Sequence, residues 1–220
     1  MALICAVGEL GAGKTLCLTY LAFRNWYLKD RRLFANYTLF GMPFYRLKTI
    51  KQLDMIRDGF VAVDEVWLWG LDSRCSQRKV NRIMGNILAR SRKRKLTYGF
   101  TVQTMSQLDK RLAKVLDFIA YPILNRTETI CKLVVCDITR KPLKVFRFRT
   151  APIFKMYKTD EEVSEILDDV TGSKSKKNDE AAYDAGRPEK LELPFREPEV
   201  DDDESDKLEG SDEDRDNEDD

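Results

Sequence analysis

Short runs of consecutive apolar residues, separated by polar segments, dominate the first two thirds of the chain. Such runs are typical of parallel strands that are covered on both faces. The predicted strands are 2–7, 32–37, 60–63, 96–102 and 116–121, with Pro122 expected to stop the last one. Two later segments, 129–136 and 143–148, alternate apolar and polar side chains and predict an antiparallel hairpin at one edge of the sheet.

Helical spacing of apolar residues fills the gaps between these strands. It predicts helices over 14–29, 77–94, 106–114 and 160–169. Strands that alternate with helices indicate an α/β fold with a mainly parallel central sheet and helices on both faces. Hydrophobic periodicity ends near residue 170, so we expect one folded domain over 1–170 and a disordered acidic tail over 171–220.

The formal net charge of +1 conceals two unlike parts of the chain. Residues 1–170 contain 30 Lys and Arg against 17 Asp and Glu, or +13, whereas residues 171–220 contain 8 against 20, or −12. A positive folded part suits either a nucleic-acid partner or an ordinary solvated surface. Acidic tails mostly keep a protein soluble, and the alternative is that this tail imitates DNA and competes for the basic face.

Cysteine and histidine usage excludes some chemistry. The five cysteines form no CxxC pair and the chain has no histidine, which argues against a tetrahedral zinc site and favours reduced, buried thiols. Any general base must therefore be another side chain, such as a carboxylate. No apolar run approaches the ~20 residues that cross a bilayer, so we expect no membrane insertion and a cytoplasmic location.

Residues 8–15 match the phosphate-loop pattern GxxxxGK[ST] in full. The motif follows a predicted buried strand and opens a predicted helix, where backbone N–H groups bind phosphate. Lys14 is expected to neutralise the β- and γ-phosphates of ATP, and the Thr15 hydroxyl to coordinate Mg²⁺. The predicted nucleotide-binding residues are Gly8, Glu9, Leu10, Gly11, Ala12, Gly13, Lys14, Thr15 and Leu16.

Two carboxylates, Asp64 and Glu65, end the 60–63 strand. The carboxyl end of a parallel strand is the sheet edge where ligands bind. Asp64 can therefore join the Mg²⁺ shell while Glu65 activates the attacking water, which makes Glu65 the predicted catalytic base.

A basic cluster, Arg90 to Lys95, closes the helix that follows the acidic strand. Cations are favoured at a helix C-terminus in any case, so the cluster has a structural explanation. The functional alternatives are contact with DNA phosphates, or an arginine that acts on the active site of a neighbouring subunit, with Arg90, Arg92 and Arg94 as candidates. Gln103 directly follows the 96–102 strand and is expected either to sense the γ-phosphate or to cap the next turn.

This order of motifs resembles the additional-strand, catalytic-glutamate class of RecA-like P-loop ATPases. The stretches 89–103, 108–111 and 151–161 resemble the FtsK/HerA superfamily, and within it the viral genome-packaging ATPases and the Zot-like proteins of filamentous phages. The resemblance covers about residues 1–165.

The resemblance implies an ATPase that assembles as a ring around double-stranded DNA, with ATP bound between subunits. The expected ring is a hexamer. Zot-like proteins usually carry a transmembrane helix, and its absence here favours packaging of a viral genome into a capsid, with capsid or portal-vertex proteins as further partners. The location would then be the host cytoplasm or the virion. The alternative is a nucleotide-gated morphogenesis, secretion or scaffold ATPase that does not translocate DNA.

Overall fold

A computed structural model describes residues 1–71, 85, 86, 88–108 and 110–161 of the 220-residue chain. The strands are β1 (Leu3–Val7), β2 (Leu33–Ala35), β3 (Tyr45–Arg46), β4 (Gly59–Val63), β5 (Leu96–Val102), β6 (Phe118–Leu124), β7 (Ile130–Cys136) and β8 (Pro142–Arg149). The helices are α1 (Lys14–Tyr27), α2 (Ile50–Met55), α4 (Lys110–Val115) and α5 (Thr150–Phe154), with a π-helix η1 (Trp67–Leu71) and a 3₁₀ helix η3 (Met105–Gln107).

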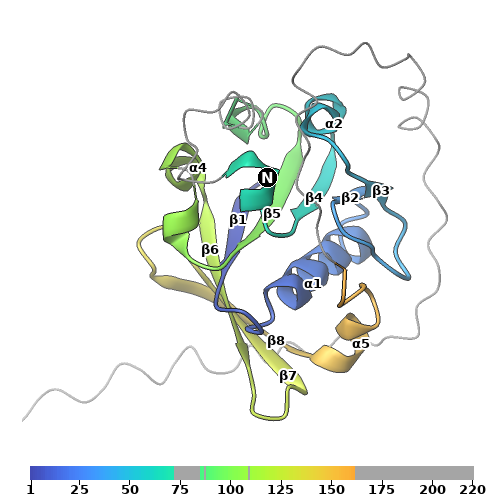
Figure 1. Ribbon diagram of the computed structural model, residues 1–220, viewed down its shortest axis with the longest axis vertical. Helices are drawn as coiled ribbons and strands as arrows, with labels where there is room; N and C mark the ends of the chain where they lie inside the picture. The colour runs from blue at the N-terminus through green and yellow to red at the C-terminus, as the bar shows by residue number, and fades with distance from the viewer. Residues whose placement is uncertain (72–84, 87, 109, 162–220) are drawn as a thin grey trace, which may run out of the picture.

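All eight strands form one sheet in the order β3-β2-β4-β5-β1-β6-β7-β8. The pairs from β3 to β6 are parallel, and β6-β7 and β7-β8 are antiparallel. Strand β5 therefore lies between the strand that precedes the phosphate loop and the strand that precedes Asp64. The predicted fold, a mainly parallel sheet with an antiparallel hairpin at one edge, is confirmed (Figure 1).

Successive side chains of each strand point to opposite faces of the sheet, and they pack into two separate cores, one on each face. On one face α1 and α5 pack together over β-strand residues such as Ala62 and Ala120 (Figure 1). The opposite core includes Leu53 of α2 and Leu112 of α4 together with Val61 and Phe100. Helices on both faces agree with the near-continuous apolar sequences of the central strands.

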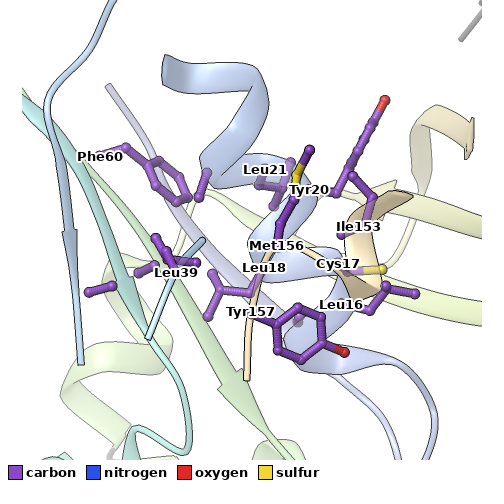
Figure 2. Packing of buried hydrophobic residues seen from close by; sticks show 14 of the residues in the cluster. Leu16, Cys17, Leu18, Tyr20, Leu21, Leu39, Phe60, Ile153, Met156 and Tyr157 are labelled. Carbon is purple, nitrogen blue, oxygen red and sulfur yellow. The ribbon is translucent and has the colours of Figure 1, made fainter. Parts of the chain in front are cut away.

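Gly99 in the middle of β5 sets how closely α1 approaches the sheet. A Cβ atom built on this residue would lie 2.5 Å from Leu18 Cδ1 of α1 and 2.9 Å from Phe60 Cζ. Both neighbours are fully buried, so the helix occupies space that any other residue at position 99 would fill (Figure 2).

The prediction that Pro122 stops its strand was wrong, since β6 continues to Leu124. β6 pairs with β1 as far as Ala120, and beyond that point β7 is its one neighbour among the residues that the structure describes. Pro122 therefore lies where one side of the strand has no ladder to interrupt, which is where a sheet tolerates proline.

The helices were predicted less completely than the strands. The expected 106–114 helix is two short elements, η3 and α4, and the expected 14–29 helix ends at Tyr27. Half of the predicted 77–94 helix, nearly all of the 160–169 helix and the predicted tail lie outside the described residues. Short elements such as α2, α5 and β3 gave no clear periodic signal in the sequence.

Four cysteines, at positions 5, 17, 131 and 136, are buried and free, as expected, and Cys75 lies outside the described residues. Among the residues that the structure places, no helix has the length and apolar character needed to span a membrane.

Candidate active site

The phosphate loop follows β1 and turns directly into α1. Gly11 and Gly13 have φ angles of 77° and 85°, a left-handed backbone that glycine adopts without strain. The Gly8 amide donates to the Val102 carbonyl at 3.4 Å, which holds the start of the loop against the end of β5. Lys14 Nζ donates to the Glu9 carbonyl at 2.8 Å, so its ammonium group lies inside the loop.

Thr15 and Asp64 meet although 49 residues separate them. The Thr15 hydroxyl donates to Asp64 Oδ2 at 2.9 Å. Asp64 directly follows β4 and is 8% exposed. Burial raises the pKa of its carboxyl, and hydrogen bonds from Thr101 and Thr15 together with the charge of Lys14 act in the opposite direction.

The residues that fix Asp64 come from both neighbouring strands. On the β5 side, Thr101 Oγ1 donates to Asp64 Oδ1 at 2.5 Å. On the β2 side, Asn36 Oδ1 accepts from the Asp64 amide at 2.8 Å and Asn36 Nδ2 donates to the Asp64 carbonyl at 2.9 Å. Asn36 and Thr101 are both buried, so this end of β4 is held on each side by polar groups without competition from water.

Glu65 turns away from the strand with a φ angle of 47°, which few residues other than glycine adopt. Its amide donates to Thr101 Oγ1 at 2.7 Å, the same hydroxyl that contacts Asp64. Burial raises the pKa of the Glu65 carboxyl, the charge of Asp64 raises it further and Lys14 lowers it. Burial lowers the pKa of Lys14, which the two carboxylates counteract. One threonine thus sets the geometry of both acids.

The donor set around Thr15 and Asp64 fits Mg²⁺. Magnesium in nucleotide sites takes one or two protein oxygens and obtains the rest of its octahedron from phosphates and water. The described residues hold no cluster of three or more metal-binding side chains, so a cation here would depend on the nucleotide for most of its ligands.

A cavity of about 650 Å³ joins these groups. It brings the predicted Lys14, Thr15, Asp64 and Glu65 together in one space. Four further residues of the predicted phosphate-binding segment, Leu10, Gly11, Gly13 and Leu16, also line the cavity, as does Tyr37 after β2, which was not predicted. The remaining lining residues were not predicted as site residues, and they are Leu124, Glu128, Phe154, Tyr157, Lys158, Thr159 and Glu161.

Gln103 follows β5 at the same edge as the phosphate loop and is half-buried. Its amide donates to Gln107 Oε1 at 3.2 Å, as in a capped turn, and it is not among the cavity-lining residues. The predicted sensor role of Gln103 is therefore supported by its place at the end of β5, and no contact of Gln103 with the cavity supports it.

The basic cluster lies at the opposite, amino edge of the sheet because it precedes β5. Arg92 pairs with Asp117 at 2.7 Å, and Arg94 is buried against Asp54 and the Leu53 carbonyl. Arg90 is exposed and, within the described part of the chain, makes no ion pair. None of these arginines lines the cavity of its own subunit.

The chain is similar to known proteins in structure and not in sequence. No protein family profile and no curated protein sequence matches the chain. The N-terminal domain of zonular occludens toxin from Neisseria meningitidis has a TM-score of 0.52 and 16% identity, over 72% of this chain and 100% of that one. A genome packaging NTPase from Sulfolobus turreted icosahedral virus 2 is also similar, in its AMPPCP complex with a TM-score of 0.47 and 10% identity, over 67% of this chain and 97% of that one. In its sulfate complex the TM-score is 0.46 and the identity 12%, over 67% and 96%.

The resemblance that the motifs indicated is confirmed at the level of the fold. The protein has a P-loop NTPase fold, shared with the N-terminal domain of zonular occludens toxin.

Proposed function

We propose that this chain is an ATPase that binds MgATP at the phosphate loop and couples hydrolysis to the movement of double-stranded DNA, with packaging of a viral genome into a capsid as its role. One observation carries the proposal. The Thr15 hydroxyl and the Asp64 carboxylate lie 2.9 Å apart, in the same cavity as Lys14 and Glu65.

Each residue then has one task. The loop amides and Lys14 hold the phosphates, and Thr15 and Asp64 hold Mg²⁺, which when bound neutralises charge on the phosphate oxygens. Glu65 accepts a proton from the attacking water, and no histidine is present to take its place. Gln103 would register the state of the γ-phosphate from the end of β5.

The case for an oligomer rests on the residues that the structure describes, since no arginine among them lines the cavity. Charge that develops on the transferred phosphoryl group is commonly stabilised by an arginine. Arg90 and Arg92 lie at the amino edge, so they can reach only the nucleotide of another subunit. This supports a ring, with six subunits as the proposed number.

DNA as the partner is supported by surface charge. Exposed basic residues gather on the β7-β8 hairpin, where Lys132, Lys144 and Arg149 lie, and in the Arg90 cluster. Phosphate contacts of this kind give sequence-independent affinity, which is what a translocase requires.

The test is ATP hydrolysis by the full chain with and without double-stranded DNA at low salt. We expect DNA to raise the rate, and the stimulation to fall as salt increases. Lys14→Ala should abolish both the basal and the stimulated rate. An active enzyme that ignores DNA would refute translocation and favour the nucleotide-gated morphogenesis or scaffold ATPase.

A further inference from the structure

The cavity has a second wall that the phosphate groups do not need. Besides Lys14, Thr15, Asp64 and Glu65, the lining includes Phe154, Tyr157, Lys158, Thr159 and Glu161, which come from the segment that begins at the end of α5. We refer to residues 154–161 as the strap. A volume of about 650 Å³ is within the range of pockets that enclose whole small molecules.

The strap is fastened to the loop after β2. The Phe40 amide donates to the Met156 carbonyl at 2.7 Å, and Leu39 and Tyr157 form an isolated antiparallel bridge. Further along, the Lys158 amide donates to the Thr38 carbonyl at 3.3 Å. Backbone contacts of this kind fix the position of the wall whatever its side chains are.

Glu161 fastens the far end of the strap. Its Oε2 accepts from the Thr38 amide at 2.7 Å, and its Oε1 accepts from Arg46 at 2.5 Å. Burial alone would raise the pKa of the Glu161 carboxyl, but Arg46 and Thr38 together bring it below its ordinary value. Both oxygens of the carboxylate therefore hold the strap in place, and the wall is formed without a ligand.

Part of the wall is aromatic and apolar, beside the charged residues Lys158 and Glu161. Phe154 and Tyr157 have ring centroids 6.2 Å apart. Tyr157 lies beside Leu16, which directly follows Thr15 at the start of α1 (Figure 2). Leu124 at the end of β6 faces the loop, since its Cδ1 atom would lie 3.3 Å from a Cβ atom on Gly13. A planar aromatic ligand fits such a surface better than another charged group does.

We propose that the strap holds the base of the nucleotide, with Phe154 as the residue that stacks on it. This inference rests on the proposed function, because the phosphates at Lys14 and Thr15 tether the nucleoside to the same cavity. The phosphate loop then supplies charge recognition, and the strap distinguishes a nucleotide from a bare polyphosphate.

The experiment compares ATP with inorganic tripolyphosphate, which has the phosphates and no nucleoside. Isothermal titration calorimetry with Mg²⁺ measures both affinities for the full chain. We expect Phe154→Ala to weaken ATP binding about ten-fold and to leave tripolyphosphate binding unchanged, since stacking on an aromatic ring is lost. Lys155→Ala is the matched control, because Lys155 is the next residue, is exposed and does not line the cavity.

Three outcomes would overturn the proposal: ATP affinity unchanged in Phe154→Ala, equal weakening of both ligands, or wild-type protein that binds ATP no more tightly than tripolyphosphate. Phe154→Leu keeps apolar volume without the ring and replaces the alanine variant if that one loses its fold. Lys14→Ala should weaken both ligands. Wild-type protein that binds neither ligand would refute the proposed function as well, which distinguishes the two failures.

Discussion

The two edges of the central sheet carry polar residues of opposite charge and opposite organisation. At the carboxyl edge, Asn36 after β2, Thr101 of β5 and Thr15 of α1 converge on Asp64 through hydrogen bonds of 2.5–2.9 Å. At the amino edge, the basic cluster makes ion pairs, and the Arg92 side chain is 74% exposed. The hydrogen bonds to Asp64 are largely shielded from water, whereas the ion pair of Arg92 is screened by solvent.

This difference indicates how the chemistry is divided. A buried network holds catalytic groups in fixed positions, which is what transition-state stabilisation requires. An exposed arginine gains comparable strength only when another surface covers it. Under the proposed function, one subunit would supply the nucleotide-binding groups and Glu65, and an arginine of a second subunit would complete the site.

The largest effect is expected from Glu65→Gln at the carboxyl edge. The amide keeps the size of the side chain but cannot accept the proton, so kcat should fall about 10³-fold. ATP affinity should stay near the wild-type value because Lys14 and Thr15 are unchanged. Steady-state hydrolysis and calorimetry measure the two quantities, and retained turnover would show that Glu65 is not the base.

A smaller loss, about 10²-fold in kcat, is expected when Arg90 and Arg92 are both replaced by alanine, since one developing charge loses its partner. Lys93→Ala is the control within the same exposed cluster. Mixing the double variant with Glu65→Gln should restore part of the activity, because each subunit supplies what its neighbour lacks. Two inactive proteins that stay inactive together would contradict action between subunits.

The smallest effect is expected from Thr101→Val, which keeps the shape of the side chain and removes the hydroxyl that holds Asp64 and Glu65. We expect kcat to fall about ten-fold and the Mg²⁺ concentration for half-maximal rate to rise. Thr101→Ser should recover both values, which a packing role would not predict. The control is Thr97→Val on the same strand at the amino edge, where the hydroxyl accepts from Arg31 at 2.6 Å. Equal losses in the two valine variants would contradict a positioning role for Thr101.

The sequence predicted the groups whose chemistry has a local pattern. Gly11, Gly13 and Lys14 stand in a fixed motif, and Asp64 and Glu65 end an unmistakable apolar run. The direction of β5 also predicts that residues just before it lie at the edge opposite to Gln103.

The rest depends on contacts that no local pattern encodes. In the sequence, Thr101 looks like any threonine that is packed inside a strand. Its contact with Asp64 depends on the register of β5 beside β4. The strap meets residues 38–46 across more than 100 positions, so neither Phe154 nor Glu161 carried a local signal. The prediction for Pro122 was wrong because a strand tolerates proline where one neighbouring strand has ended, and the sequence does not show where β1 stops pairing with β6.

The missing side chain at Gly99 has a mechanical consequence. Leu18 fills that space, so α1 is keyed into the sheet and cannot slide or rotate over it without breaking close packing. Any push that phosphate chemistry gives to the start of α1 must then move sheet and helix as one block. In the proposed ring, movement during the nucleotide cycle would then occur between subunits and not between α1 and the sheet.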